Sequence, residues 1–316
     1  MVWNLTATGG GGINEGINIP FAARFDDAAV HRMTITPSAS NRDTWTFSTW
    51  MKRSNIGQMN ILAAGADDSN MTRLEFNASG NLEYEHIDAT VATDRVNSTA
   101  VYRDTTGWMH VVCAVDTTDG TEANRVRLYV NGVEVVYSTA NYPVQNVDTD
   151  VGAAVEHTVG ASPQNLEGFD GYMAETIYVD GTQEDPTAFG EFSDDTGEWV
   201  PVQYTGTIGT NGWRLDYSNS SNFGEDQSVN GNDLTDTAFA TNDQVLDTPS
   251  NNIAVLNPMG MAAEDATISQ GGLDWTYAPG GNGETPATFH IPATGKWVFE
   301  VSGLSSGANI VYIAFL

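Results

Sequence analysis

The sequence predicts an all-β fold: an antiparallel jelly-roll β-sandwich with a second, smaller β domain. Composition is the first observation, because Thr, Val, Asn, Asp and Gly dominate, while lysine occurs only at Lys52 and Lys296. Strands and turns favour such residues, whereas long amphipathic helices need Leu, Glu, Lys and Ala. The second observation is that short segments of alternating polar and large apolar residues recur through residues 21–181, separated by turn residues. Many short strands joined by turns indicate a sandwich or a barrel.

Length and charge limit the classes of function. A chain of 316 residues suits two domains of ordinary size, or one large sandwich with an appendage. The formal net charge of −29 repels phosphate backbones and anionic lipids, so we expect no nucleic-acid binding. No apolar stretch approaches about 18 residues, so we expect no membrane insertion. Cys113 is the one cysteine and stands in an apolar run, so we expect it to be buried and unpaired.

The chain divides into three expected parts. Residues 1–20 include four consecutive glycines and are expected to form an extended N-terminal arm, either a free tail or a segment that docks on a neighbouring subunit. The sandwich is expected over residues 21–250, and residues 248–252 (TPSNN) indicate a linker. A second β-sandwich unit is expected over residues 253–316. Because its last apolar run ends the sequence, we expect the polypeptide to continue beyond Leu316.

The strands of the sandwich are predicted from period-two alternation. Residues 44–51 (TWTFSTWM) alternate polar and large apolar residues, and residues 111–115 (VVCAV) are apolar throughout, which is typical of a central strand buried on both faces. Two hairpins are predicted, one turning at residues 78–80 and one at Asn131-Gly132, a dipeptide that favours a type I′ turn.

The segments after the sandwich strands are shorter. Asp185 and Pro186 predict one helical turn, with Asp185 as its N-cap. Strands are expected at residues 199–204, 213–217, 295–301 and 310–316. The polar stretch at residues 224–233 is expected to be a loop.

Four motifs resemble one family. Residues 45–53 (WTFSTWMKR), 107–116 (GWMHVVCAVD), 127–132 (RLYVNG) and 169–175 (FDGYMAE) are similar, in this order, to strand motifs of laminin-G/pentraxin-like domains. The resemblance implies a concanavalin A-like jelly roll over roughly residues 21–181. It also implies that Ca²⁺ is often bound at one rim of the sandwich.

A second resemblance follows along the chain. Residues 189–192, 199–201, 204–206, 209–213 and 226–233 look like segments of virion proteins of marine tailed bacteriophages. Residues 253–316 resemble the start of a SPRY-like sandwich. This implies a fibre, adhesin or capsid-surface protein, with other virion proteins as partners and a homo-oligomer, such as a trimer, as the assembly.

Calcium is the metal that the sequence favours, because Asp/Asn-rich loops supply the hard oxygen ligands it prefers. Asp67 and Asp68 lie in one such loop, and Asp226, Asn230 and Asp233 lie in another. Ordinary turn formation is the alternative interpretation of both loops.

Three aromatic residues near loops are candidates for stacking on a sugar. They are Tyr142, Trp199 and Trp213, and the alternative for each is packing in the core. No pattern of a nucleophilic Ser, a phosphate-binding loop or a pair of His ligands is present. The nearest pair of carboxylates, Glu83 and Glu85, is expected to be a solvated strand edge rather than a glycosidase pair.

No catalytic pattern is found, and the resemblance implies a non-enzymatic bacteriophage protein on the particle surface, most simply a tail-fibre or appendage component that binds a host-surface glycan. Two alternatives stay open. One is a capsid decoration protein, and the other is a cellular lectin-like module or glycanase.

Overall fold

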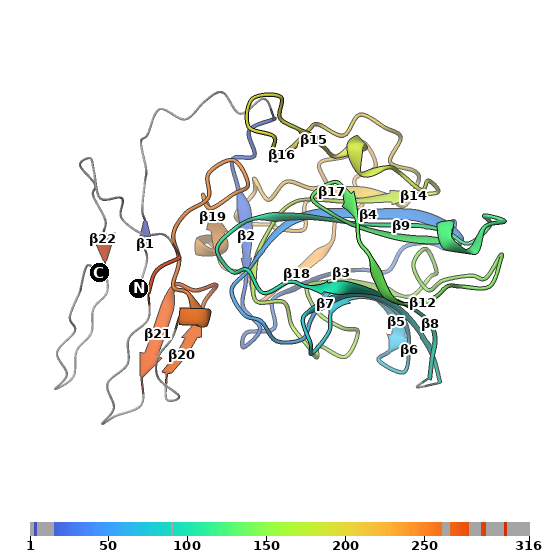
Figure 1. Cartoon of the computed structure of the whole chain (residues 1–316), viewed down its shortest axis with the longest axis horizontal. Coiled ribbons are helices and arrows are strands. Elements are labelled where there is room, and N and C mark those ends of the chain that lie inside the picture. Colours follow the sequence, from blue (N-terminus) through green and yellow to red (C-terminus); the bar gives the residue numbers. More distant parts are fainter. Residues whose placement is uncertain are drawn as a thin grey trace.

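Two antiparallel β-sheets of eight strands each lie face to face (Figure 1). The computed structural model describes residues 3–4, 16–89, 91–260, 266–277, 286–288 and 300–301. All strand pairs named below are antiparallel, so the predicted all-β antiparallel jelly-roll sandwich is confirmed.

The first sheet, here called the β4 sheet, has the order β11-β10-β9-β4-β14-β2-β19, and β17 pairs with β14 beyond the end of β2. Its strands are β2 (Ala22–Phe25), β4 (Thr44–Arg53), β9 (Met109–Asp116), β10 (Val126–Val130), β11 (Val133–Glu134), β14 (Gly171–Asp180), β17 (Trp213–Leu215) and β19 (Gln244–Val245).

The second sheet, here called the β7 sheet, has the order β12-β8-β7-β6-β5-β13-β3-β18. Its strands are β3 (Arg32–Ile35), β5 (Met59–Asp67), β6 (Asn70–Phe76), β7 (Asn81–Asp88), β8 (Val91–Val101), β12 (Tyr137–Asn141), β13 (Glu156–Val159) and β18 (Thr235–Thr237).

The main core fills the space between the two sheets. Alternate residues of β4, such as Trp45 and Phe47, meet Tyr84 of β7 and the buried Phe169. Cys113 is also fully buried in this layer, and burial raises the pKa of its thiol far above the usual range. The cysteine is therefore a small core hydrophobe, as predicted.

The outer face of the β4 sheet is covered by a third layer. Val112, Ile177 and Phe189 belong to one apolar cluster there, and Trp50 and Ile19 belong to another. This layer includes the short strands β15 (Gly190–Phe192) and β16 (Trp199–Pro201), which lie above the β4 sheet in Figure 1. It explains why residues 111–115 are apolar on both faces. Trp50 belongs to the outer cluster, and Trp108 packs against it there rather than between the two sheets.

The predicted turns have the expected backbone. Asn131 and Gly132 have φ values of 49° and 74°, as a type I′ turn requires. Asp185 accepts a hydrogen bond from the Thr187 backbone N–H and caps a 3₁₀ helix, η2 (Pro186–Ala188). The other described helices are η1 (Glu122–Asn124), η3 (Thr241–Asp243) and η4 (Pro258–Gly260). Within the described residues no helix has the length and hydrophobicity that a bilayer span requires.

The described part of the N-terminal arm docks on its own chain. The Ile17 backbone N–H donates to the Pro201 carbonyl (2.9 Å), and the Ile19 N–H donates to Ser250 Oγ (3.0 Å). Farther out, β1 (Trp3–Asn4) pairs with β22 (Glu300–Val301). The glycine run at residues 9–12 lies outside the described residues.

The expected linker is held tightly against the sandwich. Lys52 is fully buried, and its Nζ donates to Asp247 Oδ2 (2.6 Å), Asn252 Oδ1 (2.9 Å) and the Ile253 carbonyl (2.8 Å). Thr248 and Asn251 pair with each other in a tight turn. Residues 248–252 are thus a clamped connection rather than a loose linker.

A small hairpin, β20 (Ala266–Ser269) and β21 (Asp274–Tyr277), follows the linker. Its turn contacts the sandwich, where Tyr172 Oη donates to the Gly271 carbonyl (2.5 Å) and Gln270 donates to Asp26. Of the strand predicted at residues 295–301, Glu300 and Val301 are described, while residues 310–316 lie outside the described residues. The division into domains at residues 250–253 stays a prediction.

Candidate functional site

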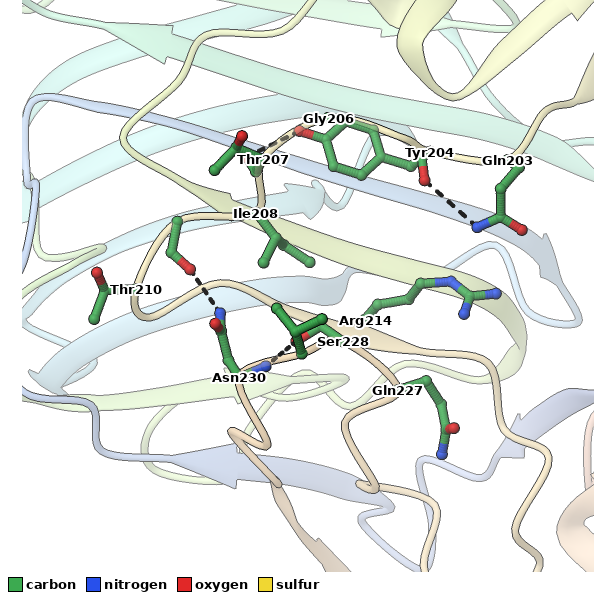
Figure 2. Close-up of a pocket in the computed structure, with 12 residues that line it drawn as sticks. Gln203, Tyr204, Gly206, Thr207, Ile208, Thr210, Arg214, Gln227, Ser228 and Asn230 are labelled. Atoms are coloured by element: carbon green, nitrogen blue, oxygen red, sulfur yellow. Dashed lines mark hydrogen bonds between the residues drawn. The ribbon is translucent and has the colours of Figure 1, made fainter.

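An open pocket of about 610 Å³ lies between two loops of the C-terminal extension (Figure 2). Residues 203–210 form one wall, residues 227–230 form the other, and Arg214 of β17 lies between them. The predicted polar loop thus contributes to a pocket together with a segment about 20 residues before it.

A strand bulge positions the base of the pocket. Glu175 in β14 has a φ of 47°, and the pairing of β14 with β4 shifts register between Ala174 and Ile177. The bulge lets Glu175 form a bidentate ion pair with Arg214, with Nε–Oε1 at 2.5 Å and Nη2–Oε2 at 2.9 Å. Glu175 is 5% exposed, and burial raises its pKa although Arg214 opposes the rise. The guanidinium in the pocket is therefore already neutralised.

The loop opposite is fixed by Asp226. Its Oδ1 accepts from the backbone N–H groups of Arg214 (2.9 Å) and Ser228 (2.8 Å), and its Oδ2 accepts from Ser228 Oγ (2.7 Å) and the Asn232 N–H (2.8 Å). Asp233 accepts from the Asp226 N–H at 2.9 Å. These donors occupy all four lone-pair positions of the Asp226 carboxylate, which leaves none for a cation.

The predicted calcium loop at residues 226–233 therefore does not fit Ca²⁺ and instead forms a rigid turn. Asn230 also serves this turn, because its amide donates to the carbonyls of Gly209 (2.6 Å) and Gly212 (2.9 Å). In the other loop, Asp67 accepts from the Ser69 N–H (2.8 Å) and the Asn70 amide (3.0 Å), and Asp68 accepts from the Gln164 N–H (3.3 Å). Calcium binding at Asp67 and Asp68 stays a prediction.

The pocket offers neutral hydrogen-bonding groups beside a small apolar surface. The side chains of Thr207, Thr210 and Gln227 are exposed and make no hydrogen bond to another described residue. Ile208 is half-buried, and Val229 is 97% exposed. Such a combination suits a ligand that presents both hydroxyl groups and C–H surfaces.

The aromatic residues that were predicted to bind a sugar do not line this pocket. Trp213 is 2% exposed and packs against Phe47 in the main core, which corrects its assignment as a sugar platform. The ring of Trp199 packs directly against the backbone of Gly132 and Gly190. These contacts are so close that a Cβ atom on either glycine would lie within 2.4 Å of the ring. Tyr142 is half-buried and packs edge-on against Tyr137 (6.3 Å between centroids), and its role in ligand binding stays a prediction.

A buried Ser–His pair occurs on the outer side of the β4 sheet. Ser48 Oγ lies 2.8 Å from His110 Nε2, and Trp199 Nε1 donates to His110 Nδ1 at 3.1 Å. Because Nδ1 accepts, Nε2 of the neutral ring carries the proton and donates to Ser48. Burial lowers the pKa of His110 to about 3. The imidazole thus cannot take a proton from Ser48, and His110 is a hydrogen-bonded core residue.

A cluster of three carboxylates lies on the outer face of the β7 sheet. Glu75 of β6 lies directly opposite Glu83 of β7, and Glu85 follows on the same face. One oxygen from each lies within 4.8 Å of the others. The prediction of a solvated strand edge is wrong, because the three side chains are 1%, 5% and 2% exposed.

The carboxylate cluster has the wrong access for glycan cleavage. Burial raises the pKa of Glu75 to about 8, which could suit a general acid. A glycosidic bond, however, must lie between the two reacting carboxylates, and Arg73 and Arg95 already occupy the space around Glu85. The sequence contained a signal for Glu75, since a hairpin turning at residues 78–80 places it opposite Glu83.

Residues 26–178 match the family model of the concanavalin A-like lectin/glucanases superfamily, a laminin G-type domain. A search of curated protein sequences gave no match.

Several solved structures are similar. A candidate carbohydrate-binding protein from Bacteroides ovatus has 15% identity and a TM-score of 0.47, over 70% of this chain and 59% of that one. A heptameric pentraxin from Limulus polyphemus has 12% identity and a TM-score of 0.41, over 54% and 82%. Domains LG4-5 of the mouse laminin α1 chain have 13% identity and a TM-score of 0.37, over 56% and 47%.

Proposed function

Because residues 26–178 form a laminin G-like, concanavalin A-like domain, we propose that this chain is a non-catalytic carbohydrate-binding protein. We place its ligand in the pocket between residues 203–210 and 227–230. The observation that carries the proposal is the pairing of exposed, unused hydroxyl and amide groups with the apolar surface of Ile208 and Val229.

The charge of the pocket selects the kind of saccharide. Arg214 is the one charged residue among those that line it, and Glu175 neutralises Arg214. No unpaired cation is left for a sialic acid or a uronic acid, and the acidic surface repels both. The ligand is therefore a neutral sugar unit within a glycan.

The affinity for a single sugar is expected to be weak. A hexose has twelve non-hydrogen atoms, and about 0.3 kcal/mol per atom gives about 4 kcal/mol, or a Kd of about 1 mM. Useful binding then requires several copies of the site acting together, as in a homo-oligomer.

A glycan array followed by calorimetry with the selected sugar tests the site. The Thr210→Ala/Gln227→Ala double variant removes two side-chain hydrogen-bonding groups and should weaken binding at least tenfold, since each net hydrogen bond contributes about 1 kcal/mol. Gln164→Ala is the matched control, because Gln164 is exposed in a different loop, after β13. Equal binding by the double variant, or an array that selects only sialylated glycans, would sink the proposal.

We further propose that the protein acts on a bacteriophage particle, as a tail-fibre or surface-appendage component that displays this glycan site to a host. The motif series at residues 189–213 and 226–233 supports this role, as does an acidic exterior that disfavours nucleic acid. The runner-up is a capsid decoration protein. Immunogold microscopy of purified particles separates the two by placing label on the tail or the head, and unlabelled particles would contradict both.

A further inference from the structure

Lys52 places a primary amine in the interior of the protein. It lies near the end of β4, directly opposite Tyr172 of β14, and its side chain is fully buried. The centroid of the Tyr172 ring is 5.6 Å from Lys52 Nζ. Burial lowers the pKa of the amine, although the neighbouring Asp247 opposes the fall. Such desolvation favours the neutral amine, which is the nucleophilic form of lysine.

A carboxylate is aimed at this amine. Asp247 is 4% exposed, and its Oδ2 accepts a hydrogen bond from Lys52 Nζ at 2.6 Å. Its other oxygen, Oδ1, accepts from Trp108 Nε1 (2.9 Å) and from the Ile253 backbone N–H (3.1 Å). These two donors fix the carboxylate so that Oδ2 faces Nζ. Asp247 therefore has the position of a general base for the amine.

A carboxamide is the third group at the same point. Lys52 Nζ donates to Asn252 Oδ1 at 2.9 Å, and because a C=O bond is about 1.2 Å long, Nζ lies no more than about 4.1 Å from Asn252 Cγ. Asn252 Nδ2 donates to the Thr106 carbonyl at 2.9 Å, which holds the amide in place. Asn252 is half-buried, so a group that leaves its Cγ has a route to solvent. An amine, an acyl carbon and a base are thus held together, with the nucleophile close to its target.

We propose that Lys52 and Asn252 join in an intramolecular isopeptide bond and that Asp247 is the general base for its formation. Asp247 takes one proton from the Lys52 ammonium, and the neutral amine attacks Asn252 Cγ. The Nζ–Cγ bond forms and the Cγ–Nδ2 bond breaks, while a second proton passes from Nζ through Asp247 to Nδ2. The nitrogen leaves as ammonia, and Asp247 keeps one proton. The buried ion pair becomes a neutral pair, and the step needs no oxidant, reductant or cofactor.

The bond would link distant parts of the chain. Lys52 and Asn252 are 200 residues apart, so the link closes a covalent loop from β4 to the segment after β19. This segment continues into the β20–β21 hairpin. The link would therefore prevent the C-terminal extension from separating from the β4 sheet. The proposal does not depend on the glycan pocket, because none of the three reacting residues lines it.

Mass spectrometry of the denatured full-length protein tests the proposal. We expect a mass about 17 Da below the sequence mass, which is the loss of one ammonia. Tryptic digestion should then give one branched peptide that joins residues 43–53 to residues 215–296, because trypsin cannot cleave after an acylated Lys52. The full sequence mass would overturn the proposal. So would the loss of ammonia without the branched peptide, because an asparagine that cyclises on its own backbone also loses ammonia.

Four variants assign the roles. Asn252→Ala removes the acyl group, and Lys52→Arg keeps a positive charge beside Asp247 without a nucleophilic amine, so both should have their full sequence masses. Asp247→Asn removes the base and should also lack the branched peptide. Asn251→Ala is the matched control, because Asn251 is the exposed neighbour, and it should keep the link. Circular dichroism verifies that each variant is folded. A branched peptide that persists in folded Asp247→Asn, or a link from Lys52 to a residue other than Asn252, would refute this assignment.

Discussion

Asp170 should make the stability of the protein depend on pH in one direction. This residue precedes β14, is 3% exposed, and faces the turn of the β20–β21 hairpin. Burial raises its pKa from 3.8 to about 7, and the neighbouring carboxylates of Asp27 and Asp26 add to the rise. The folded protein therefore keeps the Asp170 proton at pH values where the unfolded chain has released it.

The magnitude follows from proton linkage. Between pH 3.8 and about 7 the folded state binds more protons than the unfolded state, so the free energy of unfolding falls as the pH rises. The rise of the Asp170 pKa from 3.8 to about 7 corresponds to about 4 kcal/mol in the free energy of unfolding. This stability is fully present below pH 3.8 and is lost above pH 7. Asp170→Asn keeps the shape of the side chain and removes this dependence. The variant should thus gain stability relative to the wild type as the pH rises.

Urea unfolding at pH 4.5, 5.5, 6.5 and 7.5, followed by tryptophan fluorescence with chelator present, measures the effect. The quantity to compare is the difference in unfolding free energy between wild type and Asp170→Asn. His110 and His157, whose pKa values burial lowers to about 3 and about 4, add the opposite slope to both proteins and cancel in the difference. Asp195→Asn, at an exposed position, is the control. A difference that stays within about 0.5 kcal/mol across the range would refute the reasoning.

Three further predictions concern buried contacts. Lys52→Met leaves Asp247 buried without its cation, so it should lower the free energy of unfolding by about 3–5 kcal/mol in chemical denaturation. An unchanged unfolding midpoint would contradict a stabilising role of the Lys52–Asp247 ion pair. Gly132→Ala places a Cβ 2.3 Å from the Trp199 ring at a φ of 74°, so it should destabilise by about 1–3 kcal/mol and shift tryptophan emission. Nitrogen-15 NMR should find the His110 ring neutral at pH 5 with its proton on Nε2, and a doubly protonated ring would disprove this assignment. Trp199→Phe should lower the free energy of unfolding by about 1–3 kcal/mol, because it leaves His110 Nδ1 without its hydrogen-bond donor.

The sequence was informative wherever a local pattern decides the structure. The alternation at Trp45 and Phe47, the Asn131-Gly132 turn and the Asp185 cap each depend on nearby residues, and the structure confirms them. An apolar run such as residues 111–115 shows that both faces are covered, but it does not show that Phe189 and Tyr204, more than 70 residues further along the chain, cover the outer face.

The candidate sites were less predictable, because they depend on contacts between residues that are far apart in the sequence. Thr210 and Gln227 look like ordinary turn residues until the fold brings their loops together. Trp213 carries the same aromatic signal whether it faces a ligand or the core, and only its position in β17 decides between them. Glu75 was the exception, because hairpin register alone places it beside Glu83.

The pairing of β2 has a consequence for biosynthesis. This strand lies between β14 and β19, and the backbone N–H of Ile19, just before it, donates to Ser250. The first segments of the sandwich can therefore form their native contacts only after residues near 250 have left the ribosome. A recombinant fragment limited to residues 26–178 would lack β2, β17 and β19 and would expose Val112 and Ile177 to water. A recombinant version of this domain should therefore begin near residue 16. It should end at about residue 256, so that it includes the segment from Asp247 to Ile253 that Lys52 holds.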